Sequence, residues 1–426
     1  MASVLLLAAA CTSPLPSPSG LTSPTSGPEP APSAGRSPLA VDRTEVSLRP
    51  PGGGSFLVRG RYPSVHSRCR HQEQPSLRAR YPGALTVRLA SDGTLGLTVT
   101  LPFEQYLQGI AEVPPTWPIA ALEAQAIAAR SYALASTGWS GAEGEALPTP
   151  ICASAACQVY RGIPVPPEPG FSRWVQAVRR SAGEVLLYGG RPADTVYFST
   201  SDGHTYGNDQ VFGSAPLPYL RPVVEHDDRA SPESHWRVAL AYGDLARFLH
   251  AAGLWPKGTS IRAVTLQGQA VVVKGPGITR SVNESTFRDA VNTWAPCLEP
   301  GRYPSLSWKG TPLPVTVPSV WLSISGGNGV AVVTGRGWGH GVGMVQWGAY
   351  GKALRGLSAT EILAYYYGGL RPERYPELGL IHVVVASGLR SLTIVPSGPG
   401  ARLGRRELGT ARLHVTGGGH IVVTAG

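Results

Sequence analysis

Apolar and polar residues alternate near both ends of the chain, and this pattern predicts β-strands. The clearest case is LTVRLASDGTLGLTVTL (85–101), where two alternating runs flank a Ser-Asp-Gly turn, a typical hairpin signal. From Leu380 the chain alternates again in LIHVVVAS, SLTIVPS, ARLHVTG and HIVVTA. We therefore expect a β-rich N-terminal portion over residues 42–100 and a β-rich C-terminal portion over residues 371–426.

The middle of the chain has apolar residues at helical spacing. The strongest signal is the Ala-rich run IAALEAQAIAARSYAL (119–134), with Thr116 as a candidate N-cap and Pro118 in the first turn. Further helices are expected over 172–181, 242–254, 284–294 and 358–367, and strands over 184–188 and 194–200. The predicted class is α+β, with antiparallel sheets around a central Ala-rich helix in a core over residues 101–370.

Composition narrows these expectations further. The chain has 53 glycines and 40 prolines among 426 residues, which favours turns and short strands and argues against an all-helical bundle. Its formal net charge is +10, yet no run of five Lys or Arg residues occurs. We interpret this charge as a basic surface and expect no nucleic-acid partner.

The first residues are typical of an exported protein. Residues 4–10 (VLLLAAA) form an apolar run too short to span a bilayer, which needs roughly 20 residues. Ala10-Cys11, followed by Thr and Ser, resembles a bacterial lipobox, in which the cysteine is acylated. An ordinary secretory signal without a lipid is the alternative. We predict a signal peptide over 1–10, a lipid on Cys11, and a Pro/Ser/Gly-rich linker over 11–41 that is too polar to fold by itself.

The cysteine count agrees with export. If the lipid occupies Cys11, the remaining four form an even set that allows two disulfides: Cys69, Cys152, Cys157 and Cys297. Cys152 and Cys157 could close a small disulfide loop, supply two thiolates to a zinc site, or be free thiols. No His lies within ten residues on either side of them, which favours the disulfide. Cys69 and Cys297 could form the second bridge.

The segment GRGWGHGVGMVQWGAYG (335–351) has glycine at every second position from Gly335 to Gly343. Because two is the period of a strand, we expect an extended backbone with one bare face and with Trp338 and His340 on the other. A Trp beside a His suits a surface that stacks on sugars and handles protons. The alternative is a packing device, in which the bare face lies against the Ala-rich helix and both side chains are buried.

Glu112 lies in an apolar stretch, YLQGIAEVPPTWP, close to Trp117. A Glu that acts as a general acid must hold its proton, so its pKa must rise from about 4.3 toward about 6 by burial. A nearby helix N-terminus would oppose this rise because it favours the anion. A capping or salt-bridged Glu is the alternative. Asp202 and the acidic cluster at 225–228 are weaker candidates, and that cluster is typical of a solvated turn.

Four blocks of the sequence together resemble one known family, the stage II sporulation protein D family, which includes the amidase-enhancer proteins of bacterial cell walls. They occur in family order and span roughly residues 85–370. The blocks are YLQGIAEVPPTWPIAALEAQAIAARSYAL (106–134), CQVYRG (157–162), YFSTSDGHT with VFGSAPLPYLRPVVEHDD (197–228), and GRGWGHGVGMVQWGAYGKAL (335–354) with AYYYGG (364–369).

The resemblance implies a function and a catalytic residue. Founding members of the family are lytic transglycosylases, which cut peptide-stripped glycan strands of peptidoglycan and leave 1,6-anhydro-muramic ends. The catalytic Glu of the family matches Glu112, although Val113 stands where the family usually has Met. Some members bind zinc near the QVY motif, where Cys152 and Cys157 fall here. The enhancer branch implies an alternative: a non-catalytic glycan-binding protein that stimulates an N-acetylmuramoyl-L-alanine amidase.

The expected chemistry needs one carboxyl group and no cofactor. Glu112 would protonate the glycosidic oxygen and then, once ionised, remove the C6 hydroxyl proton so that this oxygen closes on the anomeric carbon. The expected partners are glycan strands, a cell-wall amidase, and the membrane through the lipid anchor. The alternative for Arg130 is an ion pair in the core. The candidate substrate-binding residues are Arg130, Ser199, Thr205, Trp338, His340 and Gln346.

Overall fold

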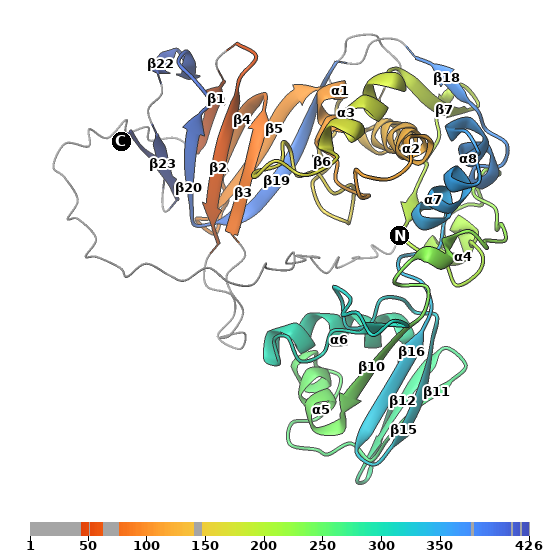
Figure 1. Cartoon of the computed structure of the whole chain (residues 1–426). Coiled ribbons are helices and arrows are strands. Elements are labelled where there is room, and N and C mark those ends of the chain that lie inside the picture. Colours follow the sequence, from red (N-terminus) through yellow and green to blue (C-terminus); the bar gives the residue numbers. More distant parts are fainter. Residues whose placement is uncertain are drawn as a thin grey trace. The chain divides into compact units, whose positions relative to one another are not determined.

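The computed structural model describes residues 44–50, 52–62, 76–139, 147–375, 379–409, 412–417 and 420–425 (Figure 1). The predicted signal peptide, the linker up to residue 41, Cys11 and Cys69 lie outside the described residues. The described chain divides into two units. Residues between Thr100 and Val384 form one unit, and the stretches up to Val99 and from Val385 form the other.

The unit built from both ends of the chain consists of antiparallel strands. The side chains of Leu95, Leu97 and Val99 are buried at every second position, as a half-buried strand requires. The predicted hairpin is confirmed: Gly93 has a φ of 79°, and its N–H donates to Ala90 O at 3.0 Å. Both chain ends are therefore β-rich, as expected.

These strands belong to two sheets. The order of hydrogen-bonded neighbours is β22-β21-β1-β4-β5-β19 in one sheet and β24-β23-β20-β2-β3 in the other. The strands are β1 (Glu45–Arg49), β2 (Ser55–Arg61), β3 (Ser76–Pro82), β4 (Ala84–Leu89), β5 (Leu95–Pro102), β19 (Leu380–Leu389), β20 (Ser391–Pro396), β21 (Ala401–Leu403), β22 (Arg406–Gly409), β23 (Leu413–Thr416) and β24 (Val422–Ala425).

The other unit is organised around the Ala-rich helix α2 (Ile119–Thr137). Its small side chains are buried around most of its circumference, as in a helix enclosed by other elements. Pro118, and not Thr116, is the N-cap residue, because the Pro118 carbonyl accepts from Ala121 N at 3.0 Å while Thr116 is exposed. Gly138 ends the helix with a φ of 69°.

Short helices and strands surround α2. Ser358 caps α8 with a reciprocal bond to Glu361, as the SATE sequence favours. The predicted strand over 194–200 is reduced to β9, which pairs in parallel with β17. These elements are α1 (Phe103–Gln108), β6 (Ile151–Cys152), α3 (Phe171–Arg180), β7 (Glu184–Tyr188), β8 (Arg191–Pro192), β9 (Tyr197–Phe198), α4 (Asn208–Phe212), a 3-10 helix (Asp228–Ala230), β17 (Met344–Val345), α7 (Gln346–Leu354), α8 (Ala359–Tyr366) and β18 (Pro372–Arg374).

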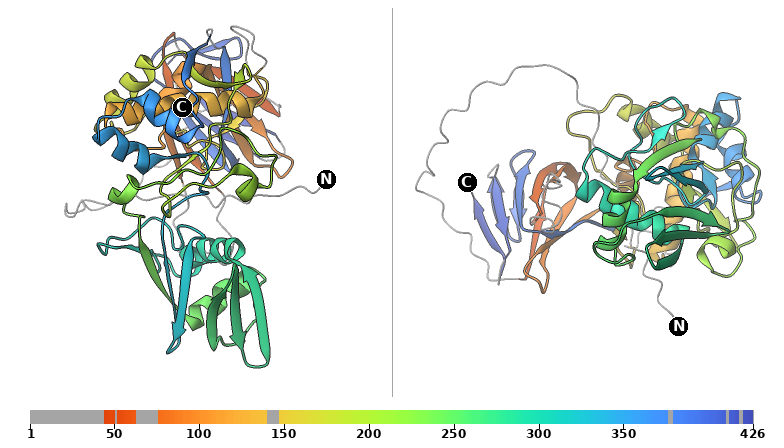
Figure 2. Two further views of the ribbon diagram at one scale, coloured as in Figure 1. Left: turned by 90° about the vertical axis from the view of Figure 1, so that its right-hand side faces the viewer. Right: turned by 90° about the horizontal axis from the view of Figure 1, so that it is seen from below.

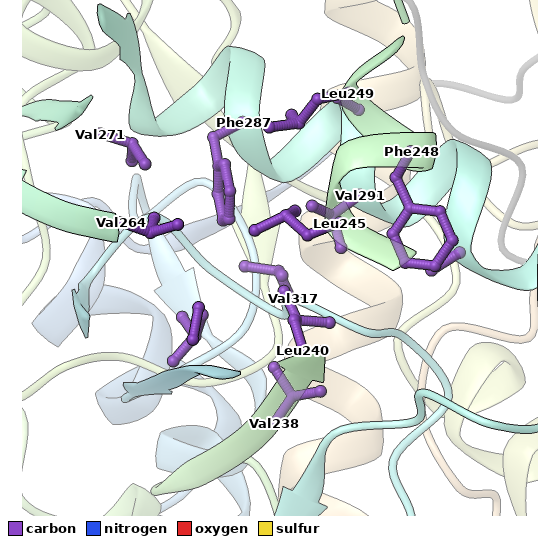
Figure 3. Close-up of a cluster of buried hydrophobic side chains, with 14 of the residues drawn as sticks. Val238, Leu240, Leu245, Phe248, Leu249, Val264, Val271, Phe287, Val291 and Val317 are labelled. Carbon is purple, nitrogen blue, oxygen red and sulfur yellow. The ribbon is translucent and has the colours of Figure 1, made fainter. Parts of the chain in front are cut away.

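Residues 236–335 have a hydrophobic core of their own, in which helices pack on antiparallel strands (Figures 1 and 2). Figure 3 shows side chains from α5, α6 and the strands pointing toward one another, among them Leu245, Phe248 and Phe287. The elements are β10 (Trp236–Ala241), α5 (Tyr242–Ala251), β11 (Ala263–Gln267), β12 (Ala270–Gly275), β13 (Ile278–Asn283), α6 (Glu284–Leu298), β14 (Leu306–Ser307), β15 (Leu322–Gly327) and β16 (Val330–Gly335).

The glycine-alternating segment is not the extended strand that its period predicts. Strand β16 ends at Gly335, and the next four alternate glycines, from Gly337 to Gly343, have φ values of 72°, 122°, 86° and 76°. A β-carbon at any of these four would lie closer than 3.0 Å to atoms of other residues. The close approach that we expected is therefore present. It is made chiefly by residues 196–206, and not by the Ala-rich helix.

Candidate active site around Glu112

Glu112 lies on the loop between α1 and α2, and a neighbouring segment holds this loop in place. Ala111 N donates to Val159 O at 2.9 Å, and Arg161 N donates to Gly109 O at 2.8 Å. Gly109 is required here because a β-carbon would meet the Tyr160 ring and Gly162 Cα. The loop and residues 159–161 are thus joined through the backbone, which sets the position of the Glu112 carboxyl group.

The two oxygens of the Glu112 carboxyl group have different surroundings. Oε1 accepts hydrogen bonds from Val159 N at 2.6 Å and from the Tyr197 hydroxyl at 3.3 Å. Oε2 accepts none from the part of the chain that the structure describes. Burial raises the pKa of Glu112 above its usual value, and those two bonds and the charge of Arg161 oppose the rise. The net direction favours the protonated acid.

A chain of polar side chains continues from Tyr197 into the core. Gln158 Nε2 lies 3.0 Å from the Tyr197 hydroxyl and 3.0 Å from Ala129 O, and the Tyr106 hydroxyl donates to Gln158 Oε1 at 2.7 Å. Gln158 and Tyr106 are both buried. None of these three side chains was predicted as part of the site from the sequence, although Gln158 lies inside the CQVYRG block.

His340 supports the backbone of β9. Its Nδ1 accepts from Val342 N at 3.1 Å, so the ring proton is on Nε2, which donates to Tyr197 O at 2.9 Å. Burial lowers the pKa of His340 to about 4, so the ring is neutral at pH 7. The Trp338 backbone exchanges hydrogen bonds with Thr200 at 2.8 and 3.0 Å, and its ring is partly buried.

Arg130 lies in the core, as the ion-pair reading had it. Its side chain is fully buried, and its guanidinium group binds both carboxylate oxygens of Glu104 at 2.8 and 2.9 Å and Glu184 O at 2.9 Å.

The remaining three substrate-binding candidates lie near β9 or on α7. Gln346 begins α7 and is buried, with Nε2 at 3.3 Å from Gln125 Oε1. Thr205 is also buried, and its hydroxyl accepts from Val223 N at 2.9 Å. Ser199 is partly exposed, and its backbone O accepts from Trp347 N at 3.1 Å.

The acidic cluster at 225–228 is not the solvated turn that its sequence predicts. Glu225 and Asp228 are buried. Lys352, also buried, places Nζ 3.1 Å from Glu225 Oε2 and 2.8 Å from Asp227 Oδ2. The countercharge comes from α7, more than a hundred residues further along the chain, so local composition could not indicate it.

Cys152 and Cys157 form a disulfide, the alternative favoured by the lack of a nearby His, with Cα atoms 5.5 Å apart. Sulfurs joined to each other are not thiolates and do not fit the zinc site of some family members. Within the described ranges, no group of three or more His, Cys, Asp or Glu side chains is arranged to hold a metal ion. Cys297 is buried and disulfide-bonded.

Three aromatic rings pack together beside the Glu112 loop. Trp117, which follows Glu112 closely in sequence, has its ring centre 5.0 Å from that of Trp347 and 5.1 Å from that of Tyr350. The last two belong to α7 and are partly exposed. Trp117 thus links this loop to the helix that follows the glycine-alternating segment.

Part of this region matches a known protein family. The family model described as Stage II sporulation protein matches residues 91–188, which include the Glu112 loop, α2 and the disulfide. These residues form a domain of the stage II sporulation protein D and amidase-enhancer family. None of the helices in the described ranges is long and apolar enough to cross a membrane.

Three relatives show the range of similarity. An uncharacterized protein of Brachyspira hyodysenteriae is 33% identical over 274 residues, which are 63% of this chain and 66% of that protein. The amidase enhancer of Bacillus subtilis is 26% identical over 305 residues, 61% of this chain and 38% of that protein. Stage II sporulation protein D of the same organism is 27% identical over 278 residues, 63% of this chain and 74% of that protein. The chain thus spans less than two thirds of the first two relatives.

Proposed function

We propose that this protein is an exported lytic transglycosylase that cleaves peptide-stripped glycan strands of peptidoglycan, with Glu112 as its single acid and base. The observation that carries the proposal is the asymmetry of the Glu112 carboxyl group. Among the residues that the structure describes, two donate hydrogen bonds to one oxygen and none donates to the other, and burial raises the pKa of the group. A raised pKa and an oxygen without a donor favour a carboxyl group that holds a proton on that oxygen and can give it to a substrate.

The reaction fits a site with one carboxyl group. Glu112 protonates the glycosidic oxygen as the bond to the anomeric carbon breaks, and then takes the C6 hydroxyl proton as that oxygen bonds the same carbon. Two-carboxylate glycosidases use a second Asp or Glu within about 10 Å. Within the described chain, Arg161 is the charged side chain that changes the pKa of Glu112, and no carboxylate does so.

The test is digestion of glycan strands whose stem peptides have been removed, with products identified by mass. The wild-type protein should release fragments that end in 1,6-anhydro-muramic acid, and Glu112→Gln should lower the rate by at least about a thousandfold. Glu123→Gln is the matched control, because burial also raises the pKa of that carboxyl group. Glu123 lies on α2 and is paired with Arg180 of α3. Full activity of Glu112→Gln, or hydrated products, would overturn the proposal.

The name of one relative, amidase enhancer, motivates a second candidate function. In that case the protein binds glycan without cutting it and stimulates a cell-wall N-acetylmuramoyl-L-alanine amidase. Stem-peptide release by a purified amidase, measured with and without wild type and Glu112→Gln, separates the two functions. Equal stimulation by both proteins, together with no glycan cleavage by wild type, would favour the enhancer.

Export and membrane attachment through Cys11 belong to the same proposal. The substrate lies in the cell envelope, so the enzyme must leave the cytoplasm. Fractionation of cells that express wild type or Cys11→Ala tests the anchor: the wild-type protein should sediment with membranes, and the variant should not. Membrane association of Cys11→Ala at the wild-type level would remove the lipid from the account.

A further inference from the structure

A backbone carbonyl fixes the direction of every hydrogen bond in the chain that leads to Glu112. One end of the buried Gln158 amide lies 3.0 Å from Ala129 O. Because a carbonyl oxygen only accepts, this end is the NH₂ group. The other end, Oε1, therefore accepts the proton of the Tyr106 hydroxyl at 2.7 Å. If the amide turned over, its oxygen would face Ala129 O and this bond would be lost.

The orientation of Gln158 in turn fixes the proton of the Tyr197 hydroxyl. The second N–H of Gln158 Nε2 points to the Tyr197 oxygen at 3.0 Å, so that oxygen accepts there. Its own proton is left for Glu112 Oε1 at 3.3 Å. The N–H of Val159, which can only donate, lies 2.6 Å from the same oxygen. A proton on Oε1 would therefore face two other donor protons.

We propose that Tyr197 is a positioning residue: held by Gln158 and Tyr106, its hydroxyl keeps Glu112 Oε1 as an acceptor, so that the acid proton is carried on Oε2. This inference rests on the proposed function. Oε2 gives its proton to the glycosidic oxygen, which leaves as a hydroxyl group when its bond to the anomeric carbon breaks. The two donors on Oε1 then stabilise the carboxylate. Oε2 takes the C6 hydroxyl proton while O6 bonds the anomeric carbon, and the acid is restored.

The other titratable groups that face Glu112 do not replace this role. They are Tyr106 from α1, Tyr132 from α2 and Arg161 from the segment after the disulfide. Burial raises the pKa of Tyr106 and Tyr132, so both stay neutral under conditions of assay. The Tyr132 ring packs edge-on against Tyr197, with ring centres 6.4 Å apart. Tyr132 is thus a close neighbour that makes no hydrogen bond to Glu112.

The experiment compares Tyr197→Phe with the matched control Tyr132→Phe in the mature full-length protein. Each variant loses one hydroxyl group from the same neighbourhood. The Glu112 carboxyl carbon is titrated by NMR after labelling with ¹³C-glutamate, and its signal is assigned by its absence in Glu112→Gln. Tyr197→Phe should move this titration upward by about one pH unit, because a donor to the charged form is lost. Tyr132→Phe should leave it unchanged.

A second variant and the cleavage assay complete the test. Gln158→Met should also move the Glu112 titration upward, but by less than Tyr197→Phe does. In this variant the Tyr197 hydroxyl can still donate to Glu112, but Gln158 no longer orients it. In the cleavage assay, the loss of kcat/KM at high pH should move upward in Tyr197→Phe to match the NMR shift. Thermal unfolding of each variant verifies that it is folded.

The possible results separate this inference from the function on which it rests. An unchanged Glu112 titration in folded Tyr197→Phe overturns the role of Tyr197, whether or not the protein cleaves glycan. If the Glu112 titration moves upward in Tyr197→Phe but the wild-type protein cleaves no glycan, the hydrogen-bond chain is supported and the proposed function is overturned. Parallel shifts in the titration and in the pH profile support both.

Discussion

Two helical glycines with opposite surroundings provide a sharp test of the packing around the site. Gly348 lies in α7, and a β-carbon there would come closer than 3.0 Å to the Tyr366 hydroxyl and to the Glu225 carboxylate. Both groups are buried. The Tyr366 hydroxyl donates to Glu225 Oε2, which also accepts from Lys352 Nζ at 3.1 Å. Gly243 lies in α5, where a β-carbon would meet nothing within 4 Å.

The two alanine variants should therefore change stability in opposite directions. Overpacking costs typically 1–3 kcal/mol, and disturbing a hydrogen bond to a buried charge adds to it, so Gly348→Ala should lose about 3 kcal/mol. Gly243→Ala should gain roughly 0.4–1 kcal/mol, because alanine restricts the unfolded chain without a clash in the helix. We expect the sign of the change, more than its size, to identify the cause.

Urea unfolding followed by tryptophan fluorescence, together with thermal unfolding, measures both changes. One kcal/mol corresponds to a shift of about 2–4 °C in Tm for a cooperative unit of about 150–250 residues. Both glycines lie in the unit between Thr100 and Val384, so both variants are compared with the same wild-type transition. Equal stability of Gly348→Ala and wild type, or a loss in Gly243→Ala as large as that in Gly348→Ala, would refute the reasoning.

Three further predictions concern pH and redox state. The pKa of His340 is about 4 in the folded protein against a usual 6.5, so the unfolded chain takes up this proton at a higher pH than the folded protein does. The free energy of unfolding should therefore fall by up to about 3 kcal/mol as the pH drops from 6.5 through 4, and His340→Gln should lack this part of the pH dependence. The pKa of Glu112 is raised, so its ionised form costs folding energy above the usual pKa; Glu112→Gln should raise Tm by a few degrees at pH 7 and not at pH 4, and equal gains at both would contradict this. Loss of the Cys152–Cys157 bridge by Cys157→Ser should cost about 2 kcal/mol and lower glycan cleavage, because Gln158 and Val159 follow it directly; Cys152→Ser should have the same effect, and a larger loss in the double variant than in either single variant would contradict this.

The regular elements were predictable where one local pattern dominated. Helix α2 and the hairpin at Gly93 follow from spacing and turn chemistry within fewer than twenty residues. The helix start was wrong by two residues, because the Pro118 carbonyl performs the capping role expected of Thr116. An N-cap at Thr116 and one at Pro118 are both compatible with the local sequence, and only the path of the preceding loop distinguishes them.

The polar neighbours of Glu112 could not be predicted in the same way. Gln158 and Tyr197 lie 46 and 85 residues after Glu112, and backbone pairing of short segments brings them close to it. Two-residue strands such as β9 leave no periodic signal. The buried Glu225 presents the same difficulty, because its countercharge Lys352 comes from a distant helix.

The glycine-alternating segment contributes to the site through the backbone of β9. Gly339 permits contact with Phe198, and Gly343 permits contact with Val196, which places this segment against both ends of the strand. His340, between these glycines, then donates its Nε2 proton to the carbonyl of Tyr197. The hydroxyl of the same Tyr197 meets Glu112. We expected the glycine pattern to leave an exposed surface for binding sugar. In the structure it instead supports the backbone of Tyr197, whose hydroxyl group orients Glu112.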